Sequence, residues 1–238
     1  MLDSFRDTFR LPDLKRRILF TLAALFVYRL GAHVPTPGVD AAALGRLFDQ
    51  GSILGFLDLF AGGALSRFSI FALGVTPYIN SSIVMQLLAV VVPSIEKLQK
   101  EGEEGRKKIV QWTRYGTIIF AFIQAVGMTG WLRGLGIYTG SFMDIILVSL
   151  TLTTGAVAVM WLGEIMSDHG IGNGISLLIF AGIVVRIPEA VVRTFSLVRL
   201  GEMNALVLLL AIAVMLAVVA GCVMLQEGQR RLPVQYAK

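Results

Sequence analysis

An uncharged run at residues 68–92 constrains the fold of this chain more than any other feature. It extends for 25 residues without Asp, Glu, Lys or Arg, which is long enough for a helix to cross the hydrocarbon core of a bilayer. The apolar stretch before it, residues 55–65, is only about half as long and contains Asp58, Gly62 and Gly63. Such a short helix is tolerated at membrane depth where other protein covers it or where it lines a watery cavity. We therefore predict a short re-entrant helix at residues 55–66 inside a helical bundle, with the charge of Asp58 in a water-filled funnel.

The composition supports a membrane protein. Hydrophobic residues make up 55% of the chain and charged residues 16%, whereas soluble domains average about 25% charged residues. The mean hydropathy is +0.75. The single cysteine, Cys222, excludes a disulfide framework within the chain. We predict an all-α polytopic membrane protein.

Apolar segments separated by polar connections predict six transmembrane helices. They occupy residues 18–34, 68–92, 115–132, 145–163, 175–185 and 203–225. Pro77 lies inside the second span and predicts a kink there. Residues 94–114 form the longest polar connection, which Gly102 and Gly105 are expected to break. Residues 1–17 fit a short amphipathic surface helix; a cleavable signal peptide is the alternative, but no small-residue cleavage site follows the first apolar run.

Basic residues are distributed unevenly between the two predicted sides of the membrane. The side with both termini and the loop at residues 94–114 holds 14 of the 21 basic residues. By the positive-inside rule, that side is cytoplasmic.

The residue pattern indicates no catalytic site. His33 and His169 are expected at span edges on opposite sides of the membrane, and the sequence has neither a zinc-binding HExxH helix nor a GxSxG nucleophile turn. We therefore predict no enzymatic activity, no metal and no cofactor. A small-solute secondary transporter is the alternative function, because such proteins also use broken helices. The predicted span centres, however, lack the deep ionisable residues typical of ion-coupled transport.

Several uncharged features have two interpretations each. Five uncharged polar residues of the second and third spans either bond neighbouring helices together or line a wet seam between helices that can part: Asn80, Ser81, Ser82, Gln86 and Gln124. The pairs Val75 with Ile79 and Ile175 with Ile179 have i, i+4 spacing; they are either packing residues or part of an apolar ring that closes a pore by dewetting. The charged run KEGEEGRKK is either a solvated loop or a docking surface.

Four motifs in this order carry a resemblance to a known family: AGGALSRFSIFALGVTPYINSSIVMQLL, KEGEEGRKKIVQWTRYGT, GIGNGISLLIFAGI and QRRLPVQYAK. Together they resemble the SecY family, the channel subunits of the bacterial Sec preprotein translocase. The likeness covers nearly the whole chain and implies a fold with two inverted halves and ten spans around an hourglass pore. This chain would then contain a cytoplasmic N-terminus (1–17), the first half (18–195), a sixth span (196–225) and the start of a cytoplasmic loop (226–238). Four spans would be missing, so we expect either a fragment or one part of a split protein.

The resemblance also implies roles for individual residues. Residues 55–66 would form a plug that seals the pore from outside, with plug residues Phe60, Gly62, Gly63, Leu65 and Ser66. The pore ring would include Val75, Ile79, Ile175 and Ile179. The second and third spans would form one side of a lateral gate with a polar cluster at Asn80 and Gln124. Partner docking would fall to Arg106, Lys107, Lys108, Arg230 and Arg231.

The function implied by the resemblance is protein transport. The chain would belong to the central channel that translocates unfolded secretory proteins across the bacterial cytoplasmic (inner) membrane and inserts membrane proteins into it. Implied partners are the SecE and SecG subunits, the SecA motor or the ribosome on the cytoplasmic side, signal peptides, nascent chains and the lipid bilayer.

Overall fold

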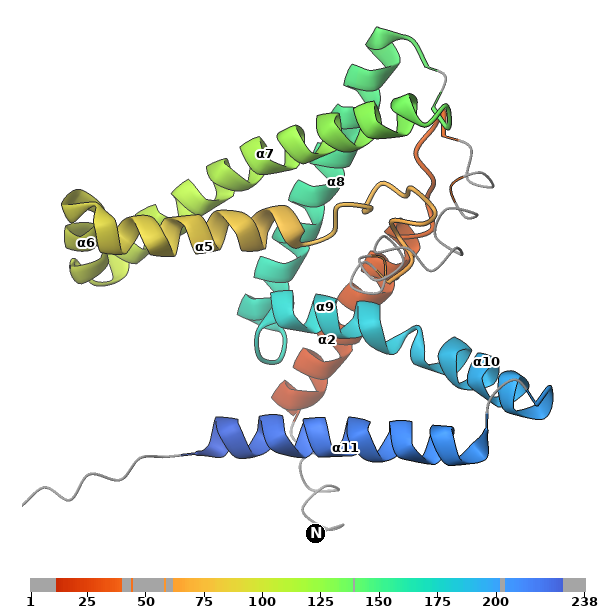
Figure 1. Cartoon of the computed structure of the whole chain (residues 1–238). Coiled ribbons are helices and arrows are strands. Elements are labelled where there is room, and N and C mark those ends of the chain that lie inside the picture. Colours follow the sequence, from red (N-terminus) through yellow and green to blue (C-terminus); the bar gives the residue numbers. More distant parts are fainter. Residues whose placement is uncertain are drawn as a thin grey trace, which may run out of the picture. The chain divides into compact units, whose positions relative to one another are not determined.

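The computed structural model describes residues 12–39, 44, 58, 62–138, 140–201 and 204–228. Helices are the regular elements of these residues and carry the labels of Figure 1. They are α2 (Pro12–Gly31), α5 (Thr76–Val91), α6 (Pro93–Lys100), α7 (Glu103–Gly134), α8 (Phe142–His169), α9 (Gly174–Val184), α10 (Ile187–Arg199) and α11 (Ala205–Glu227). The predicted all-α class is confirmed.

Two compact units divide the chain, Met1–Arg186 and Ile187–Lys238. The first contains α2 and α5 to α9. The second contains α10 and α11, whose described side chains are all at least partly exposed. In α11 these side chains are almost entirely apolar, as expected for a helix that faces lipid.

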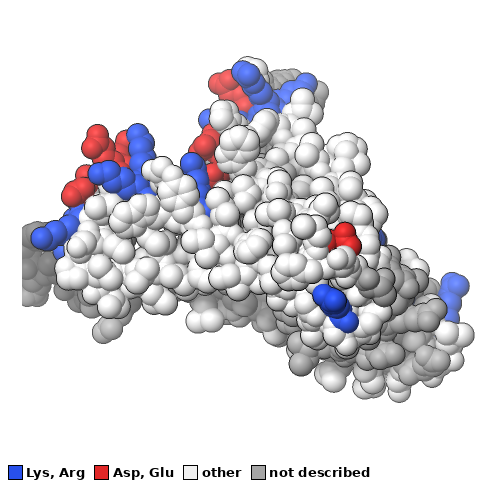
Figure 2. Space-filling model, turned by 90° about the horizontal axis from the view of Figure 1, so that it is seen from above, with Lys and Arg blue, Asp and Glu red and all other residues white. Residues whose placement is uncertain are grey.

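Four helical segments are long and apolar enough to cross a membrane: Glu103–Gly134, Phe142–His169, Gly174–Arg199 and Leu206–Glu227. The pair α5 and α6 is a fifth candidate, bent by 101° at the break between them. These counts apply to the described residues and do not confirm the predicted number of six. Much of the visible described surface is uncharged, and charged side chains gather in a few patches (Figure 2).

The second predicted span is helical only in its later part. Residues 62–75 form turns, and α5 begins at Thr76 with Pro77 in its first turn. A proline is favoured there because the first N–H groups of a helix have no partner within the helix. The expected mid-span kink at Pro77 is therefore wrong.

The predicted polar connection at residues 94–114 is mostly helical, because α6 and the start of α7 occupy it. Gly102 does mark a break, with a φ of +80° immediately before α7. Gly105 instead lies within α7, where a side-chain Cβ would overlap the carbonyl oxygen of Leu98. Gly105 thus allows α6 and α7 to pack closely rather than interrupting a helix.

Small residues spaced four apart give α7 a face for close packing. Thr113, Thr117, Ala121, Ala125 and Thr129 are all buried, and α7 packs against both α5 and α8. The hydroxyls of Thr117 and Thr129 each donate to the carbonyl four residues earlier, at 2.8 Å. Small side chains with satisfied polar groups let helix backbones approach within a membrane.

Candidate functional site

An apolar cavity of about 590 Å³ lies where residues 62–75, called the turn segment below, meet α5, α7 and α9. Its lining includes Leu65, Val75, Ile79, Gln124 and Ile179. These residues come from three separate predictions: plug, pore ring and lateral gate. The cavity therefore brings together residues that are far apart in the sequence, such as Leu65 and Ile179, which are separated by 114 positions.

Backbone hydrogen bonds hold the turn segment that forms one wall of this cavity. Thr36 donates its N–H to the carbonyl of Phe68 at 2.9 Å, and Ile70 donates to the carbonyl of Val34 at 3.0 Å. Within the segment, Ser69 donates to Ala64 at 2.9 Å. Because irregular backbone is tolerated at membrane depth only where such groups are satisfied, these bonds allow residues 62–75 to run inside the bundle without helical structure.

Three of the four predicted ring residues share the cavity. Val75, Ile79 and Ile179 line it. Ile175 belongs to the same packed cluster, but its Cδ1 lies against α8, where a Cβ at Gly163 would overlap it. The i, i+4 pair on α9 thus has one member on the cavity wall and one between helices.

The plug prediction meets the described residues only in part. Phe60 lies outside them, and residues 62–66 form turns rather than helix. Gly62 and Gly63 have φ values of +62° and +85°, a left-handed conformation that glycine adopts without strain. A Cβ at Gly62 would also lie 2.9 Å from Cα of Gly182 in α9. Ser66 donates its hydroxyl to the carbonyl of Gly63 at 3.2 Å.

Asp58 is buried rather than in contact with water, as it is only 1% exposed. Its Oδ1 accepts the N–H groups of Leu65 and Ser66 at 3.0 Å, and its Oδ2 pairs with the guanidinium of Arg186 at 2.5 Å. The expectation of a hydrated Asp58 is wrong because the sequence reasoning did not foresee a partner 128 positions away.

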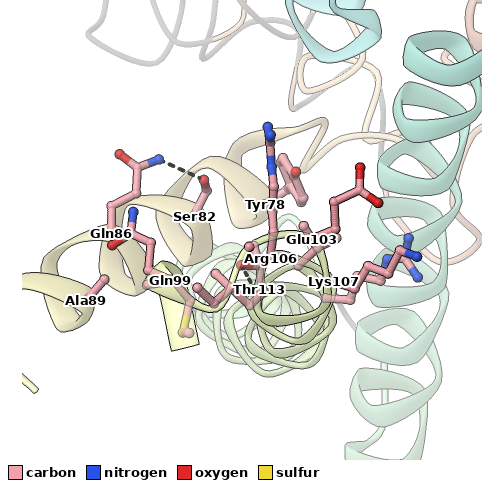
Figure 3. A pocket seen from close by; sticks show the side chains of 14 residues that line it. Tyr78, Ser82, Gln86, Ala89, Gln99, Glu103, Arg106, Lys107 and Thr113 are labelled. Carbon is pink, nitrogen blue, oxygen red and sulfur yellow. Dashed lines mark hydrogen bonds between the residues drawn. The ribbon is translucent and has the colours of Figure 1, made fainter. Parts of the chain in front are cut away.

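A second, polar cavity of about 1120 Å³ lies between α5, α6 and α7. Figure 3 shows Gln86 and Ser82 on α5, where Gln86 donates to the Ser82 hydroxyl at 3.2 Å. Arg106 and Lys107, two of the predicted docking residues, also line it. Lys108 is exposed, and Arg230 and Arg231 lie outside the described residues.

The predicted gate residues do not meet one another at a single cavity. Gln124 lines the apolar cavity, whereas Asn80 is half-buried on α5 and lies outside the sets that line either cavity.

Ser81, one of the polar span residues expected to bond across helices, makes a polar bond between α5 and α7. Its buried hydroxyl donates to the carbonyl of Thr113 at 2.7 Å. It also faces Gly116, where a Cβ would overlap it. A serine one turn from a proline and a glycine three residues after a threonine were the available signals, but neither specifies the other as a partner.

An ion pair between α7 and α8 was also not predicted. Arg114 Nε lies 2.9 Å from Glu164 Oε1, with the Arg114 side chain 45% exposed and that of Glu164 14% exposed. Among the described residues, no group of three His, Cys, Asp or Glu side chains is placed to hold a metal ion.

Comparison with known proteins identifies what the chain is similar to. A SecY family model matches residues 69–238. The chain is 48% identical over 236 residues to the protein translocase subunit SecY of Escherichia coli K12, covering 96% of this chain and 53% of that protein. It is 50% identical over 233 residues to the corresponding subunit of Haemophilus influenzae, covering 95% of this chain and 52% of that protein. The chain thus spans about half the length of these relatives.

Two solved structures share the fold. One is described as Sec61 in the canine ribosome-channel complex from the endoplasmic reticulum, the other as the structure of a protein-conducting channel. Each aligns with this chain at a TM-score of 0.52 and 23% sequence identity. The alignment covers 71% of this chain and 36% of the solved chain.

Proposed function

The chain belongs to the SecY family, and from this premise we propose that it forms part of a channel that conducts polypeptides across and into a membrane. The observation that carries the proposal is the apolar cavity, which Leu65, Val75, Ile79 and Ile179 line together. The relatives are translocase subunits and one neighbour is a protein-conducting channel, which supports the same function.

Val75, Ile79 and Ile179 act as part of an apolar pore ring, with Ile175 packed behind them. Their β-branched side chains are stiff at χ1, so a ring of them closes around an unfolded chain without offering it polar binding groups. An apolar constriction also stays dry when it is empty and thereby holds back ions. Leu65 and its neighbours in residues 55–66 serve as the plug beside this ring.

α5 and α7 form one side of a lateral gate through which apolar segments reach lipid. Asn80 and Gln124 supply polar groups on these helices, and the Ser81 bond to Thr113 holds the helices together. Because a neutral hydrogen bond of this kind has a modest net strength, the two helices can adjust to each other at small cost.

The remaining assignments follow the family. Residues 1–17 form a cytoplasmic amphipathic N-terminus, 18–195 the first half of the channel, 196–225 the sixth span and 226–238 the start of a cytoplasmic loop. SecE and SecG assemble with the chain in a bacterial inner membrane. Arg106, Lys107 and Lys108, with Arg230 and Arg231, receive SecA or the ribosome on the cytoplasmic side.

Photocrosslinking to a stalled secretory chain tests the proposal. A photoreactive amino acid at Ile79 or Ile179, in membranes that hold the assembled channel, should crosslink to the stalled chain. The matched control is Leu19 on α2, which is 67% exposed and should crosslink to lipid. Equal crosslinking from all three positions, or none from Ile79 and Ile179, would refute a pore at this cavity.

Ion conductance provides a second test. Exchanging Ile79 and Ile179 for serine wets the apolar wall, so the ion leak should rise while protein export continues. A tight membrane with lost export would show that these residues only pack the core. Uptake of a small solute that depends on the same residues would favour a transporter instead.

A further inference from the structure

Asp58 is the most deeply buried of the described charged side chains that make an ion pair. A carboxylate in such a place is stable only when its oxygens are bonded and its charge is paired. Asp58 meets both conditions: the N–H groups of Leu65 and Ser66 bond one oxygen, and Arg186 pairs with the other. Removing Arg186 from it would therefore leave a buried, uncompensated charge.

The same part of the turn segment is attached to two helices. Arg29 of α2 donates to the carbonyl of Gly62 at 2.8 Å. Gly62 packs on Gly182 of α9 so closely that a Cβ would not fit. Arg186, just beyond the end of α9, passes over Gly63, where a Cβ would lie 3.2 Å from its guanidinium nitrogen. The ion pair between Asp58 and Arg186 thus links residues 62–66 to the end of α9.

We propose that Asp58 and Arg186 form a latch that positions Leu65 on the wall of the apolar cavity and sets how readily residues 62–66 leave it. Asp58 binds the N–H of Leu65 directly, and Leu65 lines the cavity with Val75 and Ile179. The Asp58 carboxylate therefore bonds Leu65 with one oxygen and Arg186, at the end of α9, with the other. This inference rests on the proposed function, because only in a channel would the departure of residues 62–66 open a path. Its test does not measure transport.

The two partners are unequal, and this predicts an asymmetry. The Arg186 side chain is 29% exposed, whereas that of Asp58 is 2% exposed. If the pair separates, Arg186 already reaches water but Asp58 must be hydrated. Release of the latch therefore requires water to enter beside Leu65. Loss of Arg186 should accordingly weaken the closed form more than loss of the charge on Asp58.

Cysteine labelling of the full chain in proteoliposomes tests the latch. The reporter is Leu65→Cys in a Cys222→Ser background, because Cys222 is exposed and would react. The reagent is a water-soluble maleimide, and the readout is the labelling rate. Arg186→Gln should raise this rate at least about tenfold, since breaking a buried pair by removing one partner is strongly destabilising. Asp58→Asn should raise it less, because the asparagine oxygen can still accept the two N–H groups.

A double variant and a matched control complete the design. Asp58→Asn with Arg186→Gln leaves no unpaired charge, so its labelling rate should fall below that of Arg186→Gln alone. The control is Arg193→Gln, an exposed arginine of α10, which should label at the parent rate. Ser66→Cys serves as a second reporter if Leu65→Cys disturbs the cavity, and thermal unfolding of each variant identifies those that do not fold.

Two results would overturn the latch. One is a parent-like labelling rate in both Arg186→Gln and Asp58→Asn. The other is a double variant whose rate is the product of the two single effects, because independent residues behave in that way. If Arg186→Gln does not fold, Arg186→Lys replaces it, because lysine keeps the charge with altered geometry. Arg186→Lys should label at an intermediate rate, and a parent rate for this variant also counts against the latch. Crosslinking from Ile79 together with a failed labelling test would reject the latch while leaving the proposed channel intact.

Discussion

Gly155 of α8 should tolerate no side chain, because the turn segment crosses the helix there. A Cβ at this position would overlap the carbonyl oxygen of Ile70 and lie 2.8 Å from its carbonyl carbon. The oxygen would lie only 1.8 Å away, and Cβ contacts under 3.0 Å essentially do not occur. Gly155→Ala therefore requires the helix and the turn to separate by about 1.2 Å or more. Neither side of the contact is a flexible side chain that could move away.

The free-energy change follows from two opposing effects. Alanine favours a helix over glycine by about 1 kcal/mol, whereas overpacking a close contact costs about 1–3 kcal/mol. Because backbone meets backbone at Gly155, we expect the upper end, about 3 kcal/mol. Gly130→Ala on α7 is the matched control, since nothing lies within 4 Å of the new Cβ there. The difference between the two variants isolates the steric cost.

Thermal unfolding in detergent, followed by tryptophan fluorescence, measures this difference. For a chain of this size, about 3 kcal/mol corresponds to a midpoint lower by roughly 6–12 °C in Gly155→Ala than in Gly130→Ala. The displaced turn carries Leu73 and Val75, which line the apolar cavity, so the ion leak should rise as well. If both alanine variants melt together, the close contact between α8 and the turn is refuted.

Three further predictions concern other parts of the molecule. Ser81→Ala should lower the free energy of unfolding by about 0.5–1.5 kcal/mol through loss of its bond to Thr113. Ser82→Ala removes a hydroxyl that accepts an exposed hydrogen bond from Gln86 and should change the free energy of unfolding little; equal effects would argue against a special role for Ser81. Burial, reinforced by the nearby Asp144 carboxylate, raises the pKa of the Tyr138 phenol above its ordinary 10.0. The resulting stability is fully present below the unfolded pKa and is lost as the pH rises through the folded pKa, so Tyr138→Phe should flatten the alkaline decline seen in pH-dependent melting. Exchanging Arg106 and its two basic neighbours for glutamate should weaken binding of an acidic cytosolic partner at low salt, and unchanged binding would remove the docking proposal.

Three apolar segments were predictable because their structure depends mainly on local composition. The bounds of α9 and α11 lie within a few residues of the predicted spans. α8 extends beyond its predicted span into flanking polar residues. In a bilayer, a helix satisfies all its backbone hydrogen bonds within itself, so an uninterrupted apolar run is enough to specify it. The i, i+4 spacing of Val75 and Ile79 likewise placed both on one side of the chain, where the cavity lies.

Residues 68–75 show what composition alone does not decide. They are as uncharged as the helix that follows them, yet they form turns. Bonds from Thr36 to Phe68 and from Ile70 to Val34 replace helical ones, and Gly155 leaves room for the carbonyl of Ile70. These partners come from other segments, so no window of local sequence contains the information.

Residue composition and spacing were enough to predict a helical membrane protein and the residue types that could line an apolar cavity, because burial in lipid and helical periodicity are local properties. Three other features depend on tertiary packing: the pairing of Asp58, the turn of Ile175 toward α8, and the choice of Thr113 as the partner of Ser81. Each of these depends on a partner at least 32 residues away for the polar pairs, or on another helix for Ile175. Such contacts form only when the packed bundle brings distant residues together and excludes the water that would otherwise satisfy their polar groups.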